Sequence, residues 1–157
     1  MTFAEIVAAF TRAVPSGDGE RLAALFTPDG VYVDGFYGPF TGRAAIAEML
    51  EHHFHDHARD FLWDMTDLVA NDRIGYARYL FSYTSTMPES AGKRVIFSGT
   101  GCFELEGGLI RRYSENFDRG MALAQLDFAP ERIKKALLRW AKAEAERPDA
   151  AAHRTPA

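Results

Sequence analysis

Four consecutive segments rich in aromatic and branched side chains occupy the second half of the chain, and they restrict its fold more than any other feature. In order they are DFLWDMTDLV (60–69), RIGYARYLFSYTS (73–85), KRVIFSGTGCFEL (93–105) and LIRRYSENFD (109–118). Such a composition favours β-strands. Tight turns at 71–72 and 106–108 and a longer loop at 86–92 connect neighbouring segments. Strands joined by short turns pair antiparallel, so the sequence predicts a four-stranded meander.

The first half of the chain shows the apolar spacing of helices. The pattern predicts helices over 3–14 and 16–26, and a third over 43–50 that opens after Thr41. Between the second and third helices we expect a turn at 27–30, a short strand at 31–34 and a Gly/Pro loop at 35–42. Past the meander, residues 119–126 predict a connector and 129–146 a C-terminal helix with Ile133, Leu137 and Trp140 on one stripe.

Helices followed by a run of antiparallel strands define an α+β domain in which the sheet needs its apolar face covered. We therefore expect a cystatin-like cone, with a curved antiparallel sheet wrapped around three N-terminal helices and an added C-terminal helix. The part of the concave face that the helices leave uncovered would form a pocket. Residues 1–147 are predicted to form one domain, and residues 148–157 a disordered tail.

Composition argues against several classes of protein. The formal charge is −4, and no face concentrates Lys and Arg, which disfavours a nucleic-acid partner. No run of 18 apolar residues predicts a membrane span, so we expect a soluble, cytoplasmic protein. The single cysteine, Cys102, lies in an apolar strand and is predicted to be a buried, inert thiol.

Two stretches carry a family resemblance. GDGERLAALFTPDGVYVDGFYGPFTGRAAI (17–46) and GCFELEGGLIRRYSENFD (101–118) resemble the SnoaL-like and ketosteroid-isomerase-like branch of the nuclear transport factor 2-like superfamily. With the order of elements, the similarity spans roughly residues 3–120. It implies the cone-shaped fold and a pocket for a small apolar molecule. It does not choose a reaction, because the superfamily includes isomerases, cyclases, dehydratases, epoxide hydrolases and plain binding domains.

The resemblance transfers some functional residues and not others. Asp34 matches the proton-shuttling acid of ketosteroid isomerases, but Phe10 and Gly101 stand where their oxyanion-binding tyrosine and protonated acid would be. This disfavours a steroid isomerase. Of the Arg and Asp pair of limonene epoxide hydrolases, Arg78 is retained and Phe81 replaces the acid. Glu115 matches the acid on the last strand of epoxide hydrolases and SnoaL-type cyclases.

Strand alternation places Tyr32 and Asp34 on one face of their strand, and Tyr113, Glu115 and Phe117 on one face of the last strand. If both faces look into the cone, two carboxyl groups share an apolar pocket, where desolvation and mutual repulsion raise their pKa values. Asp34 would then take a proton next to a carbonyl, while a protonated Glu115, or a tyrosine hydroxyl such as that of Tyr113 or Tyr32, would stabilise the developing oxyanion. The alternatives are that Asp34 only caps the Gly/Pro loop and that Glu115 pairs with Arg78, Arg111 or Arg112.

The histidine-rich stretch EHHFHDHARD (51–60) offers metal-ligand spacings at His53/His57 and His52/His55. Because the third helix should end there, we favour a solvated helix end over a metal site. A third possibility is one histidine at the pocket rim, acting as acid, base or ligand contact. His53 is the candidate for that position, because it extends the apolar stripe of the helix.

The sequence contains no phosphate loop, Ser/His/Asp arrangement or nucleotide fingerprint, so any chemistry is predicted to need neither cofactor nor metal. We expect a cofactor-independent isomerase, cyclase, dehydratase or hydrolase acting on an apolar polyketide-, terpenoid- or steroid-like compound. The alternative is a non-catalytic ligand-binding or dimerisation module. A homodimer through the convex sheet face is also expected. Besides the catalytic pair Asp34 and Glu115, the predicted ligand contacts are Tyr32, Tyr113, Phe10, His53, Trp63, Arg78 and Phe117.

Overall fold

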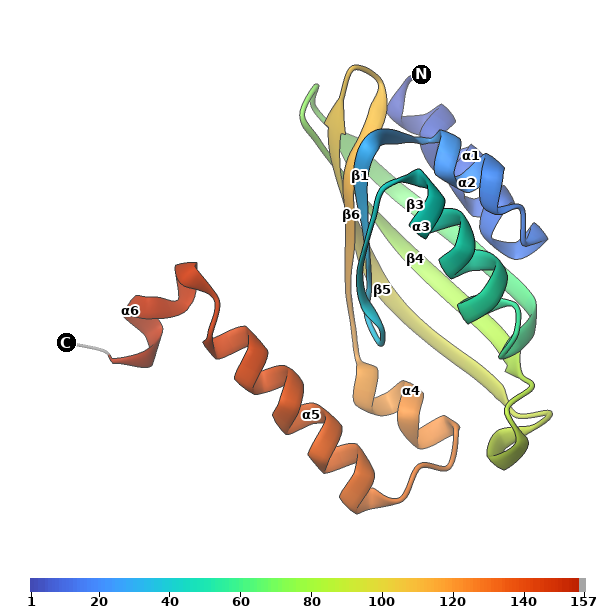
Figure 1. The fold of residues 1–157 in the computed structure, drawn as a ribbon, viewed down its shortest axis with the longest axis vertical. Helices are drawn as coiled ribbons and strands as arrows, with labels where there is room; N and C mark the ends of the chain where they lie inside the picture. The colour runs from blue at the N-terminus through green and yellow to red at the C-terminus, as the bar shows by residue number, and fades with distance from the viewer. Residues whose placement is uncertain (156–157) are drawn as a thin grey trace.

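A curved six-stranded sheet forms the body of the computed structural model, which describes residues 1–155 (Figure 1). The strand order is β2-β1-β6-β5-β4-β3. The bounds are β1 (Phe26–Asp34), β2 (Gly38–Thr41), β3 (Ala58–Ala70), β4 (Ile74–Ser85), β5 (Arg94–Glu106) and β6 (Leu109–Phe117). The predicted α+β class and the meander from β3 to β6 are confirmed. One pair departs from the antiparallel pattern, because β1 runs parallel to β6.

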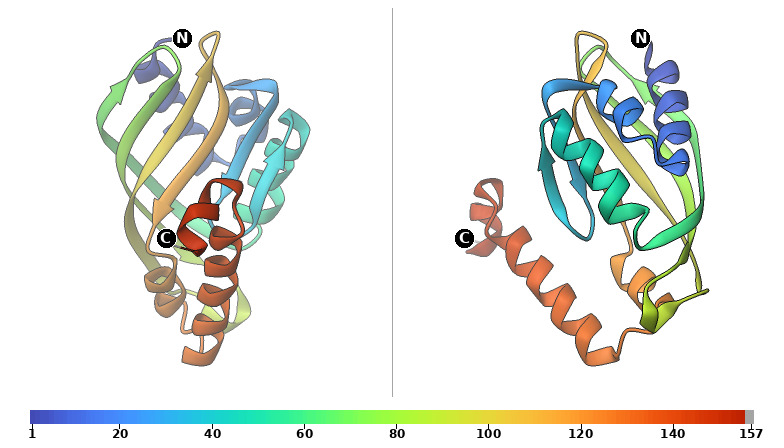
Figure 2. Two further views of the ribbon diagram at one scale, coloured as in Figure 1. Left: turned by 90° about the vertical axis from the view of Figure 1, so that its left-hand side faces the viewer. Right: turned by 45° about the vertical axis from the view of Figure 1, so that its right-hand side comes forward.

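Three N-terminal helices cover the concave side of the sheet, as predicted (Figures 1 and 2). They are α1 (Phe3–Ser16), α2 (Gly19–Ala24) and α3 (Arg43–Glu48), and α3 continues into a π-helix, η1 (Met49–Phe54). Thr2 and Glu5 form a capping box at the start of α1, and Gly17 ends the helix in the left-handed region at φ 71°. No helix within residues 1–155 has the length and apolar character needed to cross a membrane.

The segment before α3 is more regular than the sequence indicates. Residues 27–30, predicted as a turn, belong to β1, where a register shift between Phe26 and Val31 accommodates them as a bulge. The predicted loop at 35–42 contains β2, which pairs antiparallel with β1. The reason is a tight turn at 35–37, stabilised by Asp34, that brings Gly38 opposite Asp34.

An aromatic core joins α1 to the sheet. Phe10 is fully buried, and its ring centroid lies 4.7 Å from that of Tyr113 and 6.0 Å from that of Tyr32. Trp63 and Phe103 meet the same ring edge-on, with centroids 5.2 and 5.5 Å away. Each aromatic side chain of this size buries a large apolar area, so this cluster fixes α1 against four strands, β1, β3, β5 and β6.

The C-terminal part of the chain is less tightly attached. A short 3-10 helix, η2 (Pro88–Ser90), lies between β4 and β5. The sheet is followed by α4 (Arg119–Gln125) and α5 (Pro130–Ala145). Helix α5 diverges from the sheet and has no fully buried residue (Figure 2). Residues 148–154 continue as η3 (Pro148–Ala150) and a single helical turn, α6 (Ala151–Arg154). Residues 156–157 of the predicted disordered tail lie outside the described residues, and disorder of residues 148–157 stays a prediction.

The outer face of the sheet carries an apolar patch. The register aligns Leu62 of β3 and Ile96 of β5 on either side of Ser82, with Leu80 diagonal to both. These three side chains are 62%, 49% and 51% exposed. Cys102, predicted to be buried, is only half-buried, because the register places it on this outer face opposite Tyr76.

We expect this outer patch to mediate the predicted homodimer. Light scattering should give twice the 17.5 kDa mass of one chain, and Leu80→Arg should shift it to the single-chain mass, because a buried unpaired charge opposes association. Leu138→Arg is the matched control, since Leu138 is equally apolar and 60% exposed but lies on α5. Monomers from Leu138→Arg but not from Leu80→Arg would place the interface elsewhere.

Candidate functional site

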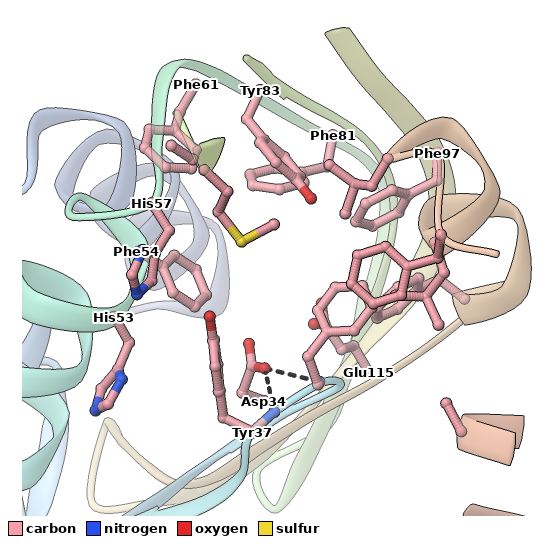
Figure 3. Close-up of a pocket in the computed structure, with 18 of the residues that line it drawn as sticks. Asp34, Tyr37, His53, Phe54, His57, Phe61, Phe81, Tyr83, Phe97 and Glu115 are labelled. Atoms are coloured by element: carbon pink, nitrogen blue, oxygen red, sulfur yellow. Dashed lines mark hydrogen bonds between the residues drawn. The ribbon is translucent and has the colours of Figure 1, made fainter. Parts of the chain in front are cut away.

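A cavity of about 280 Å³ opens between the concave face of the sheet, η1 and the α4–α5 segment (Figure 3). Aromatic side chains form most of its wall. Its lining includes Phe54, Phe61, Trp63, Phe81, Tyr83, Phe97 and Phe117. Five ionisable groups other than tyrosine also line it, namely Asp34, Glu115, His53, His57 and Arg139. The cavity is therefore an apolar container with a small number of polar contacts, as expected of a small-molecule site.

Asp34 is the last residue of β1 and lies at the cavity wall with only 4% of its surface exposed. Its Oδ2 atom accepts hydrogen bonds from the backbone N–H groups of Phe36 and Tyr37, each 2.8 Å long. Burial raises the pKa of this carboxyl group, while the two N–H donors and the nearby His53 oppose the increase. Asp34 thus caps the hairpin turn with one oxygen and also lines the cavity. The two interpretations of Asp34 are compatible.

Glu115 of β6 lies next to Asp34 in the cavity (Figure 3). Burial, and then the charge of Asp34, raise the pKa of Glu115 to about 8. The Tyr113 hydroxyl donates a hydrogen bond of 3.0 Å to its Oε2 atom. The predicted alternative of an arginine partner is not observed within residues 1–155, where Arg78 pairs with Asp67 and Arg112 with Glu104. Glu115 therefore favours the protonated form at neutral pH.

Two glycines of β5 make room for tyrosine side chains beside Glu115. A Cβ atom at Gly99 would lie 2.5 Å from the Tyr79 hydroxyl, and one at Gly101 would lie 3.1 Å from the Tyr113 ring. The Tyr79 hydroxyl is buried near Glu115 but lacks a partner with good hydrogen-bond geometry among the described residues. Gly101 occupies the position where the resemblance expected an acid, and Tyr113 fills the space that such a side chain would need.

The four histidines between 51 and 60 separate into two groups. His53 and His57 line the cavity, and the His53 ring packs against Tyr37 and Phe40 with centroids 5.2 and 5.4 Å apart. His55 instead hydrogen-bonds the Val14 carbonyl at 2.8 Å, and His52 is exposed. Of the two predicted pairs, His53 and His57 therefore lie together at the cavity, and His52 and His55 lie away from it. Within residues 1–155, no three His, Cys, Asp or Glu side chains are arranged to hold a metal.

Several predicted ligand contacts lie elsewhere. Phe10, Tyr32 and Tyr113 belong to the aromatic core behind the cavity wall, because the close packing of α1 against the sheet leaves no space around them. Arg78 is on the opposite face of the sheet, 78% exposed and 3.3 Å from Asp67, because even-numbered residues of β4 point outward there. His53, Trp63 and Phe117 do line the cavity.

The sequence did not indicate the contribution of the C-terminal segment. The wall is completed by Leu123 of α4, by Leu126 and Phe128 just after it, and by Ala136, Arg139 and Trp140 of α5. The stripe of Ile133, Leu137 and Trp140 was a signal that α5 packs against something, but its target could not be identified. Tyr37, which lies between His53 and Asp34, was likewise missed because its segment was predicted to be a loop (Figure 3).

Comparisons with known proteins agree with this architecture. The profile of the SnoaL-like domain matches residues 7–113, more than half of the chain, so the protein belongs to the SnoaL-like family of the nuclear transport factor 2-like superfamily. A comparison with curated proteins gave no match.

Solved structures with the same fold are distant in sequence. A hypothetical protein from Catenulispora acidiphila with a ketosteroid isomerase-like fold, in complex with trimethylamine, is 21% identical with a TM-score of 0.71, covering 82% of this chain and 100% of its own. A proposed polyketide cyclase from Xanthomonas campestris is 23% identical (TM-score 0.65; 78% and 95% covered). An M. tuberculosis epoxide hydrolase resembling the limonene enzymes is 21% identical (TM-score 0.63; 85% and 92% covered).

The raised pKa of Glu115 predicts a pH-dependent stability difference from Glu115→Gln. The Glu115 carboxyl group loses its proton near pH 4.5 in the unfolded chain and near pH 8 in the folded protein. Its contribution to the free energy of unfolding is therefore largest below pH 4.5 and decreases as the pH rises to 8. Because glutamine does not titrate, the free energy of unfolding of Glu115→Gln should rise relative to that of wild type by roughly 1.4 kcal/mol per pH unit across that window. Urea unfolding from pH 5 to 9 measures it.

Glu104→Gln provides the control for this measurement, because Glu104 lies on the neighbouring strand with its side chain 47% exposed. Its stability difference from wild type should not follow the same curve. A Glu115→Gln difference that stays constant from pH 5 to 9 would contradict the raised pKa.

Proposed function

We propose that this protein is a cofactor-independent acid–base catalyst that moves a proton next to a carbonyl group of a small, largely apolar compound. The observation that carries the proposal is the pairing of two carboxyl groups, the buried Asp34 and the half-buried Glu115, in one aromatic cavity. Neighbouring acids whose environments push their pKa values apart divide the roles of base and acid between them. Isomerisation, cyclisation and dehydration all contain such a step.

The environments of the two acids assign their roles. Asp34 receives two backbone hydrogen bonds through Oδ2, which stabilise its carboxylate form and leave Oδ1 for a substrate proton. Burial, and then the nearby charge of Asp34, raise the pKa of Glu115 to about 8, so Glu115 keeps its proton at neutral pH. In the proposed step, Asp34 takes a proton from the carbon next to the carbonyl while the Glu115 O–H donates a hydrogen bond to the carbonyl oxygen. The resulting enolate then takes the proton back from Asp34 at a second carbon, or attacks an electrophile within the same molecule.

The volume of the cavity limits the size of the compound that can bind. A volume of about 280 Å³ lies at the lower end of the range for small-molecule sites, so one or two rings fill it better than a four-ring steroid. The aromatic wall favours a flat compound, because rings stack on it. Of the polyketide-, terpenoid- and steroid-like classes predicted from the sequence, the small polyketide-like or terpenoid-like compounds agree best with this volume.

The alternative is a non-catalytic ligand-binding module with the same pocket. The hydrogen bonds of Asp34 favour this alternative, because its carboxylate already stabilises the hairpin turn. In that case the ligand would occupy the aromatic wall without exchanging a proton. The two functions differ in one measurable quantity, which is the rate of proton exchange in a bound ketone.

Hydrogen–deuterium exchange of 2-tetralone, a two-ring ketone with acidic protons next to its carbonyl, tests the proposal. The wild-type protein in deuterated buffer should accelerate the exchange, as followed by proton NMR. Asp34→Asn should reduce the rate to that of buffer, and Glu115→Gln should lower it at least about tenfold. Glu104→Gln should exchange like wild type. Binding of 2-tetralone without acceleration would instead support the non-catalytic module.

Substitutions of Asp34 separate its two roles. Asp34→Asn keeps an oxygen that can accept the N–H groups of Phe36 and Tyr37, so its melting temperature should stay near wild type. Asp34→Ala removes that acceptor and should cost about 1–2 kcal/mol of unfolding free energy. Both variants should lose proton exchange. Full exchange in Asp34→Asn would show that Asp34 serves the turn alone.

A further inference from the structure

We propose that the ligand is a flat aromatic or two-ring carboxylic acid whose carboxylate binds Arg139 of α5 while its carbonyl or phenolic oxygen reaches Glu115. This inference rests on the proposed function, because it names the substrate class of the same cavity. The distribution of charge along the cavity wall carries it.

Arg139 supplies a cation that no acidic side chain neutralises. It lines the cavity and makes no ion pair or side-chain hydrogen bond within residues 1–155. Other charged residues further along α5 and just beyond it do pair with one another: Lys142 lies 3.8 Å from Glu146, and Arg147 lies 2.7 Å from Glu144. A guanidinium group presents paired N–H donors that match a carboxylate, so Arg139 provides an unused anion-binding group.

A second arginine reinforces the positive potential beside Trp140. The Arg119 guanidinium lies 4.1 Å from the centroid of the Trp140 ring, and that of Arg139 lies 5.9 Å from it. Arg119 also donates a hydrogen bond of 3.1 Å to the Gly35 carbonyl in the hairpin turn. Of the nearby acids, Asp118 caps α4 through the Met121 N–H, and Glu144 is paired with Arg147. The side of the cavity formed by α5 is therefore cationic.

The opposite charge at the other polar site fixes the orientation of the ligand. Asp34 and Glu115 come from β1 and β6, and ionised Asp34 would repel a ligand carboxylate placed there. A neutral carbonyl or phenol can instead accept a hydrogen bond from protonated Glu115. The remaining wall is largely apolar and suits a ring system that separates the two polar groups. The cavity therefore selects a compound with an anion at one end only.

The weak attachment of α5 allows ligand binding to stabilise it. No residue of α5 is fully buried, and Trp140 links the helix to the hairpin through Phe36, with ring centroids 6.3 Å apart. A carboxylate held by Arg139 would join α5 to the ligand and, through it, to the sheet. The amide protons of 131–145 should then exchange with solvent more slowly when the acid is bound.

Two matched probes test this inference in the full-length protein. The first is 6-hydroxy-2-naphthoate, which carries a phenol and a carboxylate at opposite ends, and the second is 2-naphthol, which lacks the carboxylate. By titration calorimetry the acid should bind at least about tenfold more tightly to wild type. Arg139→Gln should remove this preference, because it should lower the affinity for 6-hydroxy-2-naphthoate. Arg132→Gln is the matched control, because Arg132 lies on the same helix over Phe128 and does not line the cavity.

Equal affinity of wild type for the two probes, or no measurable binding of either, would overturn the inference. So would tighter binding of trimethyl(2-naphthyl)ammonium, because a cation would then be the preferred ligand. A retained preference for the acid in Arg139→Gln would also overturn it. The proposed function fails separately, through absent 2-tetralone exchange in wild type. An acid preference without that exchange would support the ligand class in a protein that only binds.

Discussion

A helix that covers only part of a concave sheet is the constraint on which this structure depends. Phe10 of α1 packs against rings from β1, β3, β5 and β6, and this contact closes one part of the concavity. The apolar face that remains cannot stay open to water without cost, so η1, α4 and α5 approach its edges. They do not fill it. The cavity is thus a consequence of the way an α+β domain of this size covers its sheet.

The two acids can remain in that cavity because each has a different source of stabilisation. Asp34 accepts two backbone N–H groups, and these hydrogen bonds also hold the turn between β1 and β2. Glu115 accepts a single hydrogen bond, from Tyr113, and avoids most of the desolvation penalty by keeping its proton. The pair is therefore stable with one proton, which Glu115 carries. The same difference between the two groups makes Asp34 a base and Glu115 an acid. Stability and the proposed chemistry have a common physical origin.

The polar groups of this site come from other positions in the fold than those expected from ketosteroid isomerases. Phe10 and Gly101 replace the tyrosine and the acid expected from ketosteroid isomerases, yet the space at Gly101 is occupied by Tyr113 from the neighbouring strand. Tyr79 enters similarly over Gly99. The hydroxyl groups beside Glu115 thus come from β4 and β6 rather than from α1 and β5, and that of Tyr113 donates the hydrogen bond. Comparison at single positions would miss this replacement, because it involves residues distant in the sequence.

The sequence by itself determined the elements and their order. Period-2 and period-3.6 patterns are local, so the meander, the helices of the first half and the orientation of Asp34 and Glu115 could be predicted from neighbouring residues. Predictions failed where a specific side-chain contact, and not the periodicity of the pattern, decides the outcome. Residues 38–41 form a strand because Asp34 closes the turn before them, and Phe10, Tyr32 and Tyr113 leave the cavity because they pack on one another. Only the tertiary structure placed Arg139 and Trp140 at the cavity, since long-range packing, unlike local pattern, depends on which surfaces the completed sheet leaves uncovered.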